Sequence, residues 1–157
     1  MINAIAITMS EYFFFIPLVV GGVYFLLQNR EVKKNMLILS VVALPLTVLL
    51  MFVLNSVYQN PRPDIVLHFS PFFANHFASN GFPSSHTTLM TLIAGVLYVS
   101  NKKIGIFLFI VTLLSAFSRV YLGLHHTVDI IAGIFLAIVV TAISQYIINR
   151  LIFSRSQ

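Results

Sequence analysis

The sequence predicts an all-α fold, namely an integral-membrane helical bundle in which residues 1–157 form a single domain. About five transmembrane helices and a short N-terminal segment are expected. Two observations carry this prediction. Of the 157 residues, 59% are hydrophobic and only 8% are charged, whereas a soluble domain carries about 25% charged residues. In addition, five apolar segments approach or exceed the roughly 20 residues that a helix needs to cross a bilayer.

The expected spans are joined by short connections, apart from one long connection between the second and the third. They cover residues 11–29, 36–58, 83–100, 104–122 and 127–149. The second contains Pro45, which a membrane bundle tolerates because neighbouring groups satisfy the freed carbonyl. Residues 1–10 either lie in the membrane interface or lengthen the first span. The absence of cysteine excludes disulfides and thiolate chemistry.

Basic residues are concentrated on one side of this arrangement. Seven of the nine fall in connections or tails on that side: Arg30, Lys33, Lys34, Lys102, Lys103, Arg150 and Arg155. The positive-inside rule makes the side cytoplasmic. The net charge of +5 is thereby explained by orientation in a cell (inner) membrane, as a multi-pass protein, and no nucleic-acid partner is expected. The connection 59–82 then faces the extracytoplasmic side.

Two arginines, Arg62 and Arg119, fall on the outer side and break this rule. The outer edge also holds every histidine and one aspartate: His68, His76, His86, His125, His126 and Asp129. A solvated loop explains His68 and His76 well. It does not explain Arg119 and Asp129, which lie in apolar segments, where ionisable residues are functional by default. The sequence therefore predicts an active site at the outer membrane face.

An anion suits the basic part of this outer cluster. Arg62 and Arg119 can hold the oxygens of one phosphate and neutralise charge that develops during phosphoryl transfer. Ser84 and Ser85 lie at the expected start of a helix, where free N–H groups and the helix dipole favour anions. The alternative for residues 83–86 is a simple helix N-cap.

A nucleophile and an acid are also present. His125 and Asp129 are four residues apart, so they share a helix face if the helix begins near His125. The carboxylate can then fix the imidazole tautomer and leave the other nitrogen as a nucleophile, while His86 is available to protonate the leaving oxygen. A structural hydrogen bond between His125 and Asp129 is the simpler alternative.

A metal site is the competing interpretation of the same side chains. Its ligands would be His86, His125, His126 and Asp129. Two arginines beside these residues would repel a divalent cation, which favours an anion and a site without metal. His126 is expected to be a bystander at the interface.

These residues resemble the type-2 phosphatidic acid phosphatase superfamily of membrane lipid phosphatases. The family signature is Lys, six residues, Arg-Pro; then Pro-Ser-Gly-His; then Ser-Arg, five residues, His, three residues, Asp. In this chain the three motifs are Asn55-(six residues)-Arg62-Pro63, Pro83-Ser84-Ser85-His86, and Ser118-Arg119-(five residues)-His125-(three residues)-Asp129. The motifs run from residue 55 to residue 129, and the flanking helix pattern fits as well.

The resemblance implies a role for each matched residue. His125 would become phosphorylated, Asp129 would orient it and His86 would be the general acid. The phosphate would be bound by Arg62, Arg119, Ser84 and Ser85, with Asn55 at the position of the family lysine. Family members use neither a metal nor another cofactor in this chemistry.

The departures from the signature bear on the substrate. Asn55 replaces the lysine and so neutralises no charge, while Ser85 replaces the glycine. With a small chain and Phe-Pro-Ser-x-His-Thr-Thr, the sequence is most similar to bacterial undecaprenyl-diphosphate phosphatases of the bacitracin-resistance type. Those enzymes recycle the lipid carrier of peptidoglycan synthesis on the outer leaflet. The resemblance thus implies hydrolysis of undecaprenyl diphosphate to undecaprenyl phosphate.

Other functions remain open from the sequence. With the same chemistry, the substrate could be phosphatidate, phosphatidylglycerophosphate or a lipid A phosphate, and a phosphotransferase would pass the phosphate to another lipid. A metal or anion transporter is the alternative of another class, although the spans offer few ionisable groups to line a path. The oligomeric state is undetermined, since Gly133 and Ala137 only permit close helix packing.

Overall fold

A computed structural model describes residues 2–67 and 79–153 of the chain. Its helices are α1 (Ile2–Tyr12), α2 (Phe15–Leu27), α3 (Arg30–Val57), α4 (Pro63–Val66), α5 (Ser85–Ser100), α6 (Lys102–Tyr121) and α7 (Thr127–Phe153). The described residues contain no strand, apart from an isolated bridge between Pro61 and Asn80. The expectation of an all-α membrane bundle is confirmed, while His68 and His76 lie outside the described residues.

Of the five expected spans, the described residues support three or four by length and composition. Within the described residues, α3, α6 and α7 are each long and apolar enough to cross a membrane. Helices α1 and α2 make a fourth span if the pair counts as one, and they are bent by 41° relative to each other. Of the two remaining helices, α4 has only 4 residues and α5 has 16. At 1.5 Å per residue it is about 24 Å long, shorter than the ~30 Å hydrocarbon core.

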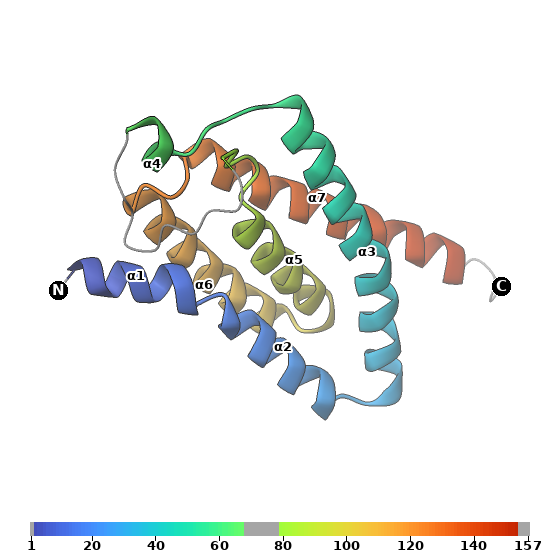
Figure 1. The fold of residues 1–157 in the computed structure, drawn as a ribbon. Helices are drawn as coiled ribbons and strands as arrows, with labels where there is room; N and C mark the ends of the chain where they lie inside the picture. Colours follow the sequence, from blue (N-terminus) through green and yellow to red (C-terminus); the bar gives the residue numbers. More distant parts are fainter. Residues whose placement is uncertain (1, 68–78, 154–157) are drawn as a thin grey trace.

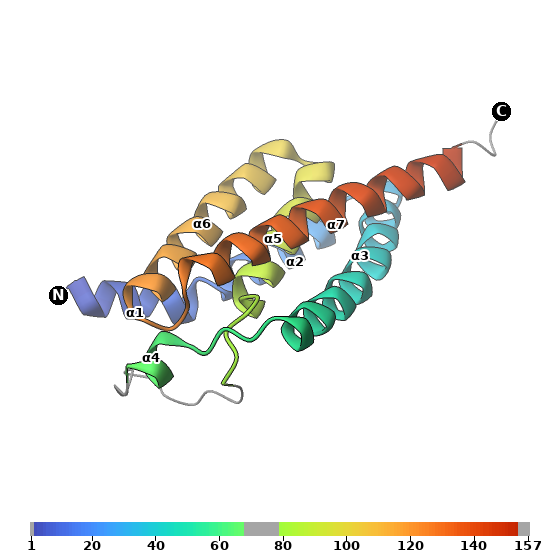
Figure 2. The same ribbon diagram turned by 90° about the horizontal axis from the view of Figure 1, so that it is seen from above.

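Helix α5 is short but central. It packs against α2, α3, α6 and α7 (Figures 1 and 2). Its buried side chains include Met90, Leu92 and Leu97, whereas α3 exposes large apolar side chains such as Phe52 and Val41, as a lipid-facing helix would. The helix that the sequence treats as a span is therefore the core about which the longer helices are arranged.

Charged first turns extend two helices beyond the limits expected from hydropathy. Helix α3 starts at Arg30, because the Asn29 side chain accepts a hydrogen bond from the Val32 N–H (3.0 Å) and caps the helix. Asn101 caps α6 in the same way, accepting from the N–H groups of Lys103 and Ile104. The basic turns are thus helical ends and not loops.

The two small residues of α7, Gly133 and Ala137, pack closely within this chain. A Cβ atom on Gly133 would lie 2.6 Å from Thr88 Oγ1 and 3.1 Å from the Ser84 carbonyl oxygen. Ala137, one turn further, is fully buried. Close packing at these positions brings the start of α7 against the start of α5, which is the arrangement that the candidate site requires.

Candidate active site

The three stretches singled out in the sequence meet at one end of the bundle. The first turn of α5, the last turn of α6 and the first turn of α7 lie together there, close to α4 (Figure 1). The Ser84 N–H donates to the Asp129 carbonyl oxygen (3.1 Å), which joins α5 to α7. The Asn60 side chain also reaches Asp129, which joins the segment before α4 to the same point.

Asp129 is fully buried and both of its carboxylate oxygens are occupied. Oδ1 accepts from Asn60 Nδ2 at 2.7 Å. Oδ2 accepts from the backbone N–H of His126 at 2.9 Å and lies 3.4 Å from Nδ1 of His125. These contacts fix the carboxylate beside the imidazole. Nε2 of His125 is left as the ring nitrogen available to a substrate.

His125 is 2% exposed and precedes the first residue of α7. Its burial lowers the pKa of the imidazole below the usual value, and the positive charges of Arg119 and Arg62 lower it further. The hydrogen bond with Asp129 and the negative charge of that carboxylate act in the opposite direction but do not reverse the shift. The imidazole is therefore neutral near pH 7, as a nitrogen nucleophile must be.

We expect this lowered pKa to be visible in a titration. Protonation occupies the nucleophilic nitrogen, so activity falls as the pH drops through the pKa of His125. The acid limb should lie below pH ~6.5, the value of a free imidazole. An NMR titration of histidine-labelled protein, assigned with His125→Ala, checks this independently of substrate titration. A His125 pKa at or above ~6.5 would contradict the assignment.

Arg62 approaches the site from the segment that leads into α4. Its backbone N–H donates to the Ser79 carbonyl oxygen at 3.2 Å, and Nη1 donates to the Leu124 carbonyl oxygen at 3.4 Å. Burial lowers the pKa of Arg62, while Asp64 and Asp129 act to raise it. A guanidinium remains charged in proteins, so the site keeps this cation.

Arg119 is 5% exposed and comes from the last turn of α6. Nη1 donates to the Ser10 carbonyl oxygen at 3.1 Å and lies 3.8 Å from Glu11 Oε1. His86, in the first turn of α5, lies within electrostatic range of Arg119, His125 and Arg62. His86, His125 and the two arginines, four of the residues that the sequence assigned to phosphate chemistry, are therefore neighbours in the structure.

The two serines at the start of α5 differ in their surroundings. Ser84 is fully buried, its hydroxyl donates to Thr87 Oγ1 at 3.2 Å, and its N–H is used by Asp129. Ser85 is exposed. The first intrahelical bond runs from the Thr88 N–H to Ser84, so the preceding N–H groups of α5 lack a helical partner and can receive an anion. The backbone is thus better suited to phosphate than the Ser84 hydroxyl.

Asn55 lies beside the site with its amide engaged. Nδ2 donates to the Phe82 carbonyl oxygen at 2.9 Å, which ties the end of α3 to the segment before α5. The side chain also borders a cleft of about 270 Å³ that Arg62, Ser85 and the apolar Phe52 help to line. This cleft connects polar groups of the site with the lipid-facing side of α3.

The metal alternative lacks a ligand set in the described part of the chain. There, no group of three or more histidine, cysteine, aspartate or glutamate side chains is arranged to share an ion. His126 points elsewhere, because its Nε2 lies 3.1 Å from the Pro61 carbonyl oxygen. Its backbone N–H, and not its ring, takes part in holding Asp129.

Comparison with known proteins decides the family. The sequence model of the PAP2 superfamily matches residues 36–153, which extend from α3 to α7. The chain belongs to the PAP2 superfamily. This membership confirms the resemblance inferred from the three motifs, and it identifies the protein as a multi-pass member of a family of membrane lipid phosphatases.

Individual PAP2 relatives agree with this assignment. Undecaprenyl-diphosphatase BcrC of Bacillus subtilis (strain 168) is 29% identical over 139 residues, covering 88% of this chain and 71% of the relative. The bacitracin transport permease protein BcrC of Bacillus licheniformis is 27% identical over 138 residues, covering 88% and 68%. A solved structure, the transmembrane PAP2 type phosphatidylglycerolphosphate phosphatase of Bacillus subtilis, has the same fold, with a TM-score of 0.66 at 24% identity over 95% of this chain and 77% of its own.

Three residues that contact the candidate site were not predicted from the sequence, namely Asn60, Ser10 and Glu11. Asn60 stands beside Arg62 in the first motif region, but its contact with Asp129 bridges 69 positions of sequence and has no local signal. Ser10 and Glu11 precede the matched region altogether. Glu11 carried a usable signal, because it is an ionisable residue at the edge of an apolar segment.

Proposed function

We propose that this protein hydrolyses undecaprenyl diphosphate to undecaprenyl phosphate and inorganic phosphate, at the extracytoplasmic face of the cell membrane, without a metal. The observation that carries the proposal is the pairing of His125 with Asp129 through Nδ1. His86, Arg119 and Arg62 lie near enough to influence His125, or be influenced by it, electrostatically. The relatives named undecaprenyl-diphosphatase support the choice of substrate.

The chemistry proceeds in two displacements. Nε2 of His125 attacks the terminal phosphorus, forming an N–P bond while the bond from that phosphorus to the bridging oxygen breaks. His86 gives a proton to the leaving undecaprenyl phosphate. His86 then accepts a proton from water, whose oxygen attacks the phosphorus, and the N–P bond breaks to release inorganic phosphate. Asp129 holds the imidazole in position throughout.

The arginines supply the charge that this reaction needs. Negative charge develops on the oxygens of the transferring phosphoryl group, and guanidinium groups beside it stabilise the transition state. Arg119 and Arg62 influence each other electrostatically, as neighbours around one anion would. Free N–H groups at the start of α5 add donors without charge.

Helix direction supports an outward-facing site. Helices α5 and α7 run away from the site and α6 returns to it, so Lys102, Lys103 and Arg150 lie at the far ends. Helix α3 likewise begins far from the site, at Arg30, and ends beside it. If these basic ends are cytoplasmic, the site faces outward. Substrate then reaches the site from the outer leaflet.

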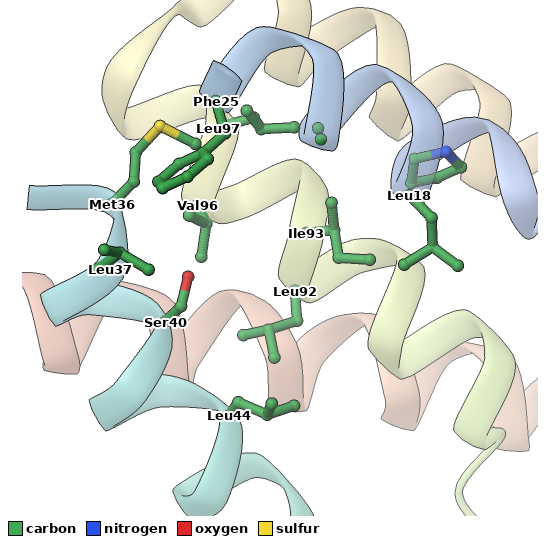
Figure 3. A pocket seen from close by; sticks show the side chains of 13 residues that line it. Leu18, Phe25, Met36, Leu37, Ser40, Leu44, Leu92, Ile93, Val96 and Leu97 are labelled. Carbon is green, nitrogen blue, oxygen red and sulfur yellow. The ribbon is translucent and has the colours of Figure 1, made fainter. Parts of the chain in front are cut away.

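An apolar cavity beside α5 suits a long hydrocarbon tail. It has a volume of about 260 Å³ and lies between α2, α3 and α5 (Figure 3). Its lining includes Leu18, Leu44 and Ile93. Ile93 is seven residues beyond His86 on α5, about 10 Å along the helix axis. A tail in this cavity would be close enough for its head group to reach the histidines.

The substrate assignment is tested by phosphate release from purified protein in detergent with EDTA present. Undecaprenyl diphosphate and phosphatidate are compared, with His125→Ala as the background. We expect release from undecaprenyl diphosphate that EDTA does not reduce. Release from phosphatidate alone would indicate that the protein acts in phospholipid metabolism instead. Transfer of label to a second lipid would indicate a phosphotransferase, and loss of activity in EDTA would overturn the metal-free mechanism.

Asn55→Lys tests whether this position selects the head group. The lysine adds a cation to the wall of the cleft beside Arg62 and Ser85. A charge-assisted contact to phosphate contributes about 1.5–3 kcal/mol. We therefore expect the ratio of activity on monophosphate lipids to activity on undecaprenyl diphosphate to rise about tenfold or more. Asn55→Gln, which lengthens the side chain without a charge, is the matched control. An unchanged ratio in Asn55→Lys would remove Asn55 as a determinant of specificity.

A further inference from the structure

The end of α1 contacts the buried arginine of the site. Arg119 Nη1 donates to the Ser10 carbonyl oxygen at 3.1 Å and to Ser10 Oγ at 3.4 Å, and it lies 3.8 Å from Glu11 Oε1. The Ser10 hydroxyl in turn donates to Glu11 Oε1 at 3.2 Å. Ser10 is fully buried. Ser10 is separated from Arg119 by 109 positions, and both Ser10 and Glu11 lie outside the segment that the PAP2 match covers.

Only one edge of the guanidinium is used by these contacts. The Arg119 Nε is buried and has no hydrogen-bond partner within residues 2–67 and 79–153. Ser10 lies in the last turn of α1, where carbonyl oxygens lack helical partners and the helix dipole favours a cation. The end of α1 therefore holds Nη1 and leaves the Nε–H free for another acceptor.

Acidic residues are scarce in this chain, and their distribution is informative. Of four in the sequence, Asp64 and Asp129 lie at the site and Glu31 lies at the far end of α3, in its first turn. Glu11 is the fourth, and its carboxylate forms an ion pair with Arg119. The bend after α1 makes another contact with the site. There, the Phe14 ring packs edge-on against the His86 imidazole, with the ring centroids 5.0 Å apart.

We propose that Ser10 and Glu11 are positioning residues for Arg119, and that the C-terminal end of α1 is a wall of the phosphatase site. The proposal rests on the phosphatase function proposed above, but not on the identity of the lipid. Ser10 and Glu11 hold the Nη1 corner, so that the Nε–H points to an oxygen of the transferring phosphoryl group. Glu11 acts through Arg119 and does not touch the substrate.

This arrangement predicts a particular kinetic pattern for Glu11→Gln. Loss of the ion pair frees the guanidinium to rotate, which impairs stabilisation of the transition state. We expect kcat to fall about tenfold, the scale of a small misplacement of a catalytic group. The lost carboxylate also repelled the anionic substrate, so KM should stay the same or decrease. Glu11→Asp keeps the charge and is expected to bring kcat back to about threefold below the wild-type value.

The control is Glu31→Gln, the same substitution in the exposed first turn of α3. It should leave kcat, KM and the melting temperature at wild-type values. All variants are assayed on the lipid that the wild type hydrolyses, and the folded fraction is measured by size-exclusion chromatography and thermal unfolding. If the end of α1 served only to stabilise the fold, Glu11→Gln would lower the melting temperature and leave kcat per folded molecule unchanged.

Wild-type kcat in folded Glu11→Gln, or a raised KM with unchanged kcat, would overturn the proposal. If Glu11→Gln does not fold, Glu11→Asp decides: kcat about threefold below wild type at unchanged KM is expected, and wild-type kcat is the contrary result. An inactive wild type would count against the proposed function instead. In that case the role of Glu11 is tested by measuring the affinity of each protein for inorganic phosphate. Glu11→Gln should bind phosphate about threefold more tightly than the wild type, and Glu31→Gln should bind it equally well. Equal affinity in all three proteins would reject the role of Glu11.

Discussion

Replacing His125 with alanine is expected to reduce phosphate release by roughly 10⁴-fold or more, the scale seen when a covalent nucleophile is removed. No other ring nitrogen is held by Asp129 in the described structure. The fold should survive, because Asp129 keeps its hydrogen bonds from Asn60 Nδ2 and from the His126 N–H. The measurement is the initial rate of phosphate release, with thermal unfolding as the check on folding.

The neighbouring histidine provides a matched control. His126→Ala removes a ring that contacts the Pro61 carbonyl oxygen and leaves the backbone N–H that donates to Asp129. We expect its activity to stay within about tenfold of the wild type, far above that of His125→Ala. Equal losses in the two variants would mean that His125 has no special role, and a fully active His125→Ala would reject the covalent mechanism.

Replacing Arg119 with alanine is expected to lower kcat by about 10³-fold, since a guanidinium beside a transferring phosphoryl group contributes on that scale. The side chain is almost fully buried. Water that enters the variant's site would therefore stabilise the negative charge of the phosphoryl group much less than the guanidinium does. Arg119→Lys should recover only part of the loss, because an ammonium group keeps the charge without the planar donor edge. Rates are measured at saturating substrate.

Arg150→Ala is the control for the loss of an arginine. Arg150 is exposed near the far end of α7, where its side chain donates to the Tyr146 hydroxyl at 3.2 Å. Its removal should leave kcat unchanged. A similar decrease in both variants would indicate a general effect of charge on the protein, and a fully active Arg119→Ala would remove this residue from the phosphate clamp.

Patterns within single helices were predictable from the sequence. The spacing of His125 and Asp129 placed both on one side of a helix start, and they are in contact. The basic end turns also marked the ends of α3 and α6 opposite the site. These features depend on a few consecutive residues, so local physical chemistry determines them.

Features set by packing between helices were not predictable in the same way. Hydropathy includes Pro83 and Ser84 in a span, whereas α5 begins at Ser85 and is short. The run Phe13-Phe14-Phe15 is uniformly apolar and gives no sign of the bend between α1 and α2. The contact of Ser10 with Arg119 depends on how these helices cross, which no local pattern encodes.

The same distinction explains what was missed around Asp129. A carboxylate in an apolar segment predicts a partner, and His125 was the partner within reach along the helix. The second partner, Asn60, comes from a connection whose path is set by the Arg62 and Gly81 backbone hydrogen bonds. A Cβ atom at Gly81 would lie 3.0 Å from Asp129 Oδ2, so this connection passes directly against the carboxylate.

The most direct test of the account is to identify the residue that carries the phosphate during turnover. Purified protein is mixed with undecaprenyl diphosphate labelled in its terminal phosphate, quenched in alkali to preserve phosphohistidine, digested and analysed by mass spectrometry. Label is expected on His125 in the wild type, and none is expected in His125→Ala. Label on His86, His126 or a serine of the α5 start, or turnover with no labelled protein at all, would contradict it.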